Sequence, residues 1–182
     1  LDFLNEYGLA ENTIVIFFSD NGGGGAADNS PLRGAKGQMF EGGIRVPCIV
    51  RWPAKLPAGE TCEEFLTSLE VFPTLCSASG AKRPKGVKLD GFDMIPVLQG
   101  KKKSQRGEMF WQRRLDKAAR VGHWKWVESG RGNGLFDLRN DLSEKNDLSA
   151  ERPEILNKLK ARFENWKKEM AAAEPRGPFR DY

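Results

Sequence analysis

The sequence has little histidine and little cysteine, and this limits the chemistry that it can carry by itself. Its 182 residues include one histidine and three cysteines. The cysteines Cys48, Cys62 and Cys76 are widely spaced, which is the pattern neither of a disulfide framework nor of a zinc site. The cysteines therefore provide no metal signature and leave the redox compartment open.

Long apolar runs and a strong charge of one sign are also absent. No apolar stretch approaches the roughly 20 residues that a membrane-spanning helix needs. The net charge is only +4, and the lysines and arginines are spread along the chain apart from Lys101 to Lys103. Such a short run is more typical of a solvated loop than of a nucleic-acid patch. We therefore expect no membrane span and no nucleic-acid partner, while the basic balance agrees with an anionic substrate.

An apolar run that stops at two oxygen-bearing side chains is the first informative feature. Ile14 to Phe18 lacks polar alternation and is rich in β-branched and aromatic residues, which predicts a strand buried on both faces. Asp20 and Asn21 follow it, at the carboxyl end, where open α/β sheets bind ligands. A carboxylate beside an amide oxygen favours Ca²⁺ or Mg²⁺ over zinc, but two ligands leave the shell incomplete. A simple Asp-Asn-Gly turn is the alternative.

A lone lysine among small residues follows the glycine-rich turn. Lys36 stands in Gly34-Ala35-Lys36-Gly37, so a tetrahedral oxyanion could approach both its ammonium and the nearby backbone N–H groups. The alternative is an ordinary solvated surface lysine. The order of the segments thus suggests a metal site beside an anion site.

These segments resemble type I sulfatases, the arylsulfatase-like enzymes. SDNGG followed by LRGAKGQMFEGGIRVP looks like the C-terminal part of their active-site region. Further similar segments follow in the family's order, namely LTSLEVFPT, LDGFD, GHWKW and LFDLRND. The likeness covers about residues 1 to 165, so it is far more specific than any single motif.

The resemblance implies roles for particular residues. Asp20 and Asn21 match the pair that binds a divalent cation, usually calcium, and Lys36 matches the lysine that contacts the substrate sulfate. Glu41 and Arg45 lie in the same motif, although a structural ion pair around the Gly-Gly turn explains them equally well. In such enzymes a hydrated formylglycine attacks the sulfur of a sulfate ester, with the cation as its activator.

Other parts of the family pattern are missing. The formylglycine arises from Cys or Ser in C/S-x-P-x-R, and none of the cysteines here has that context. The one histidine, His123, is far downstream, and we expect it at the surface in a strand or turn. The chain also starts as if midway through a helix that ends at Gly8. We therefore expect a fragment whose nucleophile lies in a preceding part, and which is inactive alone.

The expected fold class is α/β, the C-terminal part of an alkaline phosphatase-like sulfatase fold. Residues 1–100 would belong to the catalytic domain, with a second strand from Ile44 to Arg51 and a helix from Ser68 to Ser79. Ser68 is the candidate cap of that helix, and Gly80 is its expected stop. Residues 101–182 would form a small subdomain with a four-stranded antiparallel sheet. Its strands are expected at 108–112, 118–121, 124–128 and 135–138. A terminal helix capped by Ser149 would pack on this sheet through Ile155, Leu159, Phe163, Trp166 and Met170.

Three functions fit these observations. The leading one is metal-dependent hydrolysis of a sulfated small molecule or glycan, and the family's members suggest a periplasmic or secreted location. A phosphoesterase or phosphonate hydrolase of the same superfamily is the second. The third is a noncatalytic module that binds acidic glycans through Lys36, Lys101 to Lys103 and exposed tryptophans.

Overall fold

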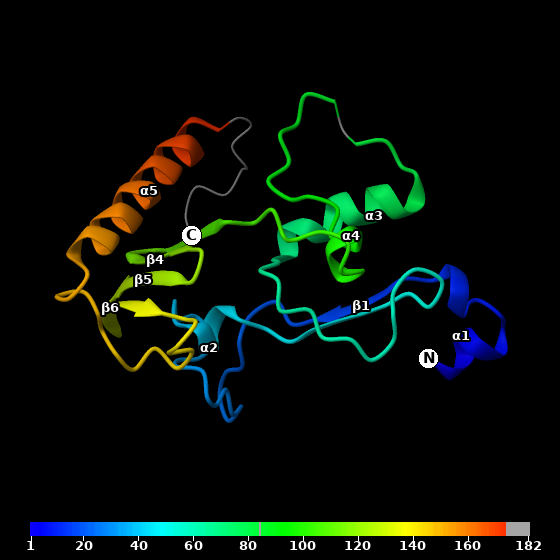
Figure 1. The fold of residues 1–182 in the computed structure, drawn as a ribbon, viewed down its shortest axis with the longest axis horizontal. Helices are drawn as coiled ribbons and strands as arrows, with labels where there is room; N and C mark the ends of the chain where they lie inside the picture. Colours follow the sequence, from blue (N-terminus) through cyan, green and yellow to red (C-terminus); the bar gives the residue numbers. More distant parts are fainter. Residues whose placement is uncertain (84, 174–182) are drawn as a thin grey trace. The chain divides into compact units, whose positions relative to one another are not determined.

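A computed structural model describes residues 1–83 and 85–173 (Figure 1). By their contacts the residues form two compact units. The first consists of residues 1–17 and 48–107, and the second of residues 18–47 and 108–182. The segment that contains Asp20, Asn21 and Lys36 thus groups with the C-terminal part of the chain. The predicted domains 1–100 and 101–182 stay a prediction.

The first unit is built from short helices and a two-stranded sheet. In chain order its elements are α1 (Asp2–Glu6), η1 (Ala10–Asn12), β1 (Val15–Phe18), β2 (Cys48–Arg51), η2 (Ser68–Glu70), α3 (Val71–Ser79) and α4 (Ile95–Leu98). Strands β1 and β2 pair with each other. The predicted end of the helix at Gly80 is confirmed, because Gly80 has the left-handed φ of +72° that ends α3.

Two details of the first unit correct the sequence prediction. The strand at Ile14 to Phe18 is not buried on both faces, since Phe17 is 67% exposed. Among the described residues it pairs only with β2, so one of its edges has no neighbouring strand. The helical segment is capped by Thr67 rather than Ser68, because the Thr67 hydroxyl accepts the Leu69 N–H and the Glu70 carboxylate accepts the Thr67 N–H.

The second unit contains α2 (Glu41–Ile44), an antiparallel sheet and a long helix. The sheet has the order β3-β4-β5-β6 and comprises β3 (Glu108–Arg113), β4 (Asp116–Val121), β5 (Trp124–Ser129) and β6 (Gly132–Asp137). The helix α5 spans Pro153–Ala172. The predicted four-stranded sheet and terminal helix are therefore confirmed. The predicted strand Ile44 to Arg51 is shorter, because residues 41–44 form α2 and the strand starts at Cys48.

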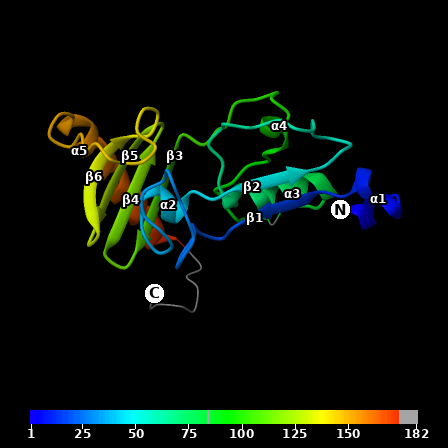
Figure 2. The ribbon, with the colours of Figure 1, turned by 90° about the horizontal axis from the view of Figure 1, so that it is seen from below.

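The sheet of the second unit is covered on both faces, as Figure 2 shows for α5 and α2. Side chains alternate across a strand, so Trp126 faces α5 while Val127 faces the segment before α2. One core contains Phe110, Ala119, Trp126, Leu135, Leu159 and Phe163. The other contains Met39, Phe40, Ala118, Val127, Phe136 and Leu138. A loop from the first quarter of the chain therefore packs on a sheet formed by residues 108–137.

Helix α5 packs on the sheet through its apolar stripe as predicted, but two predicted details, the contact of Met170 and the cap at Ser149, are wrong. Leu159 and Phe163 are buried and Trp166 stacks on Phe110 at 5.6 Å between ring centroids. Met170 is 42% exposed and lies outside this core. Ser149 does not cap the helix, because its hydroxyl donates to the Asp147 carboxylate and the helix begins four residues later, at Pro153.

We expect Phe163→Ala to reduce the free energy of unfolding by about 3–5 kcal/mol, because a fully buried ring would be replaced by a cavity. Phe163 makes edge-to-face contact with Trp126 at 5.5 Å between centroids, so tryptophan fluorescence during denaturation reports the change. Met170→Ala on the same helix is the control, with an expected change within about 0.5 kcal/mol. Equal effects of the two substitutions would contradict the burial of Phe163 between α5 and the sheet.

Candidate functional site

The oxygen donors Asp20 and Asn21 lie in the loop that follows β1. The Asp20 side chain is exposed and Asn21 is half-buried. The Ser19 hydroxyl donates a hydrogen bond of 2.8 Å to the Asn21 carbonyl and so fixes the backbone there. Within the described residues neither the Asp20 carboxylate nor the Asn21 amide is engaged in a hydrogen bond or ion pair. Both side chains are therefore available to a ligand.

The donor chemistry of this loop fits a hard divalent cation but does not complete its shell. One carboxylate and one amide oxygen are ligands that Ca²⁺ and Mg²⁺ prefer. Among the residues that the structure describes, no group of three or more histidine, cysteine, aspartate or glutamate side chains is arranged to hold a metal ion. Asp20 and Asn21 could thus supply two ligands of a cation site, and the other ligands would have to come from outside this loop.

Lys36 lies in a second loop that is hydrogen-bonded to the first. Its backbone N–H donates to the Gly23 carbonyl at 3.0 Å, two residues after Asn21. Its side chain is exposed, and a Cβ on Gly24 would lie 3.1 Å from the Lys36 Cβ. In the described part of the chain the ammonium has no carboxylate partner. The structure therefore brings the predicted sulfate-binding residue beside the turn that follows the predicted metal ligands.

Asn29 and closely packed glycines hold the two loops together. The Asn29 side chain accepts the Gly23 N–H at 3.0 Å and donates to the carbonyls of Gly23 and Gly34 at 2.9 and 3.2 Å. The Gly22 N–H donates to the Gly43 carbonyl at 2.9 Å. A Cβ at Gly22 would lie 1.8 Å from the Gly42 carbonyl oxygen, so only glycine allows the loops to approach this closely.

A buried ionic cluster lies under the lysine-bearing loop. Lys125 on β5 places its Nζ 2.8 Å from Glu41 Oε1 and 2.8 Å from Glu144 Oε1. The second contact is an ion pair outside hydrogen-bond geometry. The Lys125 and Glu144 side chains are fully buried, and that of Glu41 is 3% exposed. Burial raises the pKa of the Glu144 carboxyl, and the Lys125 ammonium opposes that rise.

Sequence reasoning anticipated only part of this cluster. The predicted pair of Glu41 and Arg45 is present at 3.8 Å, but Arg45 is exposed and Lys125 is the nearer partner of Glu41. Lys125 stands between two tryptophans in GHWKW. A charged residue inside such an aromatic strand was the sequence feature that could have indicated a buried ion pair. Glu144 is in a loop and gave no signal in its local sequence.

His123 occupies the turn between β4 and β5, as predicted. Its side chain is one-third exposed, and its Nε2 lies 3.8 Å from an Asp137 carboxylate oxygen. The Nδ1 atom lies 3.2 Å from an Arg139 guanidinium nitrogen. The surface position predicted for this residue is confirmed.

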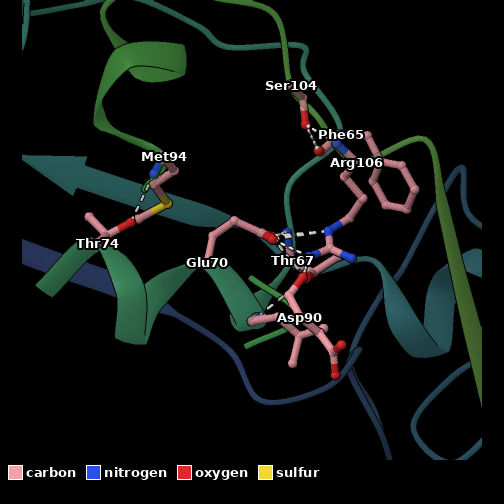
Figure 3. Close-up of polar contacts among 9 residues, drawn as sticks. Phe65, Thr67, Glu70, Thr74, Asp90, Met94, Ser104 and Arg106 are labelled. Carbon is pink, nitrogen blue, oxygen red and sulfur yellow. Dashed lines mark hydrogen bonds and ion pairs between the residues drawn. The ribbon is translucent and has the colours of Figure 1, made fainter. Parts of the chain in front are cut away.

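A separate polar cluster in the first unit joins several of the family-like segments (Figure 3). The buried Glu70 carboxylate accepts hydrogen bonds from Arg106, from the Thr67 N–H at 2.5 Å and from the Thr67 hydroxyl at 2.9 Å. Arg106 also donates to the Asp90 carbonyl at 3.1 Å. A Cβ at Gly91 would lie 1.9 Å from the Leu69 carbonyl oxygen. The segments around residues 70 and 90 therefore have a structural role in holding this unit together.

Comparisons with known proteins agree on one family. The family model described as Sulfatase matches residues 1–81. Human arylsulfatase A is 33% identical over 177 residues, which are 86% of this chain and 33% of that protein. Mouse steryl-sulfatase is 41% identical over 115 residues, which are 58% of this chain and 18% of that protein. The chain thus spans a third or less of the length of these relatives.

A solved structure extends the likeness to three dimensions. The crystal structure of Ps i-CgsB in complex with k-i-k-neocarrahexaose has a TM-score of 0.82 and 32% sequence identity. The match covers 91% of this chain and 38% of that chain.

Proposed function

Since the chain belongs to the sulfatase family, we propose that it contributes the cation-binding and sulfate-binding loops of a sulfuric ester hydrolase. The α/β, alkaline phosphatase-like fold predicted from the sequence is the fold of its structural neighbours. The observation that carries the proposal is the hydrogen bond from the Lys36 N–H to the Gly23 carbonyl. It joins the loop that carries the Lys36 ammonium to the loop that carries Asp20 and Asn21, whose side chains have no partner in the described part of the chain.

In this proposal Asp20 and Asn21 hold a divalent cation, Ca²⁺ or alternatively Mg²⁺. Such an ion, when bound, neutralises sulfate charge and stabilises the charge that develops on oxygen during ester cleavage. The Asp20 carboxylate and the Asn21 amide oxygen would supply two of its ligands. The formylglycine nucleophile and the remaining ligands would lie outside these residues.

Lys36 would hold the sulfate group itself. Its exposed ammonium can donate hydrogen bonds to a nonbridging sulfate oxygen, and charge-assisted bonds of this type are roughly twice as strong as neutral ones. The stem of the side chain lies beside Gly24, since a Cβ there would lie 3.1 Å from the Lys36 Cβ. A sulfate ester therefore binds with its anionic end toward Lys36.

The substrate proposed is a sulfated small molecule or glycan. The relatives include an arylsulfatase, a steryl-sulfatase and a protein crystallised with neocarrahexaose. Two of these names are those of sulfatases with different substrates, and the third names a carbohydrate ligand. Among the described helices none is both long and apolar enough to cross a bilayer.

The test is hydrolysis of 4-nitrophenyl sulfate and 4-nitrophenyl phosphate by the full-length protein, before and after removal of divalent cations. We expect faster cleavage of the sulfate, loss of that activity with chelator and recovery with added Ca²⁺. Faster cleavage of the phosphate would favour the phosphoesterase alternative. Salt-sensitive binding of sulfated glycan without hydrolysis or cation dependence would favour the binding module.

A further inference from the structure

Glu144 binds both ends of the segment that carries Lys36. Its backbone carbonyl accepts a hydrogen bond from Arg33 Nη1 at 2.9 Å, and its Oε2 accepts the Glu41 N–H at 2.6 Å. Residues 33 and 41 flank Lys36, so a residue from a distant part of the chain closes this loop. Lys125 completes the attachment, because its Nζ lies 2.8 Å from carboxylate oxygens of both Glu41 and Glu144.

The groups that hold the loop are themselves rigidly placed. Lys125 is on β5, an inner strand paired with both β4 and β6. It shares a sheet face with Val127, which packs in the core together with Met39 and Phe40. Glu144 has a φ of +52°, a conformation uncommon for residues with a side chain, which persists where the surroundings fix it. The loop is therefore attached to a stable support.

Stability alone does not account for this cluster. It buries two carboxylates around one ammonium, and the loss of hydration of buried ions offsets much of their attraction. A well-packed apolar group in place of such ions is often equally stable or more stable. Ions of this kind can instead hold a chain in one arrangement, and here the chain that they hold is the one with the sulfate-binding lysine.

We propose that Lys125 and Glu144 are positioning residues, which fix the place of the Lys36 ammonium through Glu41 and Arg33. This inference rests on the proposed role of Lys36 as the sulfate ligand. Displacement of a binding group by about 1 Å can reduce a rate by roughly 100-fold, even when the altered residue is remote from the chemistry. Neither Lys125 nor Glu144 needs to touch the substrate.

The test is Lys125→Met in the full-length protein, assayed with 4-nitrophenyl sulfate. We expect kcat/KM to fall by about 10-fold to 100-fold, because the loop loses its buried anchor. Lys117→Met is the matched control: its ammonium pairs with Glu128 at 2.9 Å on the same sheet, but the side chain is 25% exposed. That control should change kcat/KM less than about twofold, as a partly exposed pair contributes little.

A double-mutant cycle separates positioning from general damage. If Lys125 acts through Lys36, then Lys125→Met should lower the residual activity of the Lys36→Ala enzyme by less than about threefold, since coupled residues are not additive. Amide hydrogen exchange of residues 34–42 should also become faster in the Lys125→Met protein. Glu144→Gln, which keeps an oxygen for the Glu41 N–H, should give a smaller loss with the same coupling and serves if Lys125→Met does not fold.

Two results would overturn the inference. One is that Lys125→Met, or Glu144→Gln, lowers kcat/KM by the same factor in the Lys36→Ala enzyme as in the unaltered enzyme. The other is unchanged activity of either folded variant. In both cases a large loss in Lys36→Ala would leave the proposed function intact, whereas full activity of Lys36→Ala would contradict the proposed function itself.

Discussion

Replacing Lys36 by alanine should lower kcat/KM for sulfate ester hydrolysis by about 100-fold to 1000-fold, the effect of losing one donor to charge that develops in the transition state. The ammonium is exposed and has no carboxylate partner in the described residues, so its charge is available for a ligand. The measurement is steady-state hydrolysis of 4-nitrophenyl sulfate by the full-length protein, with inorganic sulfate as a competitive inhibitor. Both kcat/KM and the affinity for sulfate should fall.

The same substitution should leave folding nearly unchanged. Among the described residues Lys36 has no ion-pair partner, so the free energy of unfolding should stay within about 0.5 kcal/mol. Lys158→Ala is the matched control, because Lys158 is also an exposed lysine and lies on α5. It should change neither activity nor stability. Normal turnover by Lys36→Ala would remove the role proposed for this lysine.

Replacing Asp20 by alanine should weaken cation binding by at least about 10-fold to 100-fold, since even residues that only support metal ligands have effects of that size. The Asp20 carboxylate is exposed and has no hydrogen-bond partner among the described residues, so a loss of folding stability is not expected. Calcium titrations, by calorimetry and by recovery of activity after chelation, measure the change in two independent ways. Activity should return in part at high calcium.

Asp28→Ala is the control for this experiment. Asp28 is an exposed carboxylate in the same loop, and it accepts the Ser30 N–H at 2.8 Å. Its removal should leave the calcium titration unchanged. Equal calcium affinities for the Asp20→Ala protein and the unaltered protein would place the cation elsewhere.

The sequence predicted the second unit well because its patterns are local. Short strand-like segments within 108–138 predicted the four strands, and the apolar stripe of Ile155, Leu159 and Phe163 predicted the helix. The prediction of the residue that caps the helix was wrong, because a serine hydroxyl near a helix start can bond to several different neighbours. Ser149 looked like a helix cap, but its hydroxyl bonds to Asp147.

The burial of β1 was predicted wrongly for a different reason. An apolar run shows that a strand can be covered on both faces, but burial depends on which other segments lie beside it. In the described residues β1 pairs only with β2, and Phe17 remains largely exposed. The sequence pattern shows that β1 can be buried on both faces, whereas the segments that pack beside it determine whether it is.

By itself the sequence determined the family and the residue types of the candidate site: a carboxylate, an amide and a lone lysine in glycine-rich loops. The tertiary structure decided how these loops are held. Glu41 meets Lys125 84 positions later in the chain and Glu144 103 positions later. No local pattern encodes such contacts, because ionic partners in a buried cluster are chosen by the packing of the loop on the sheet.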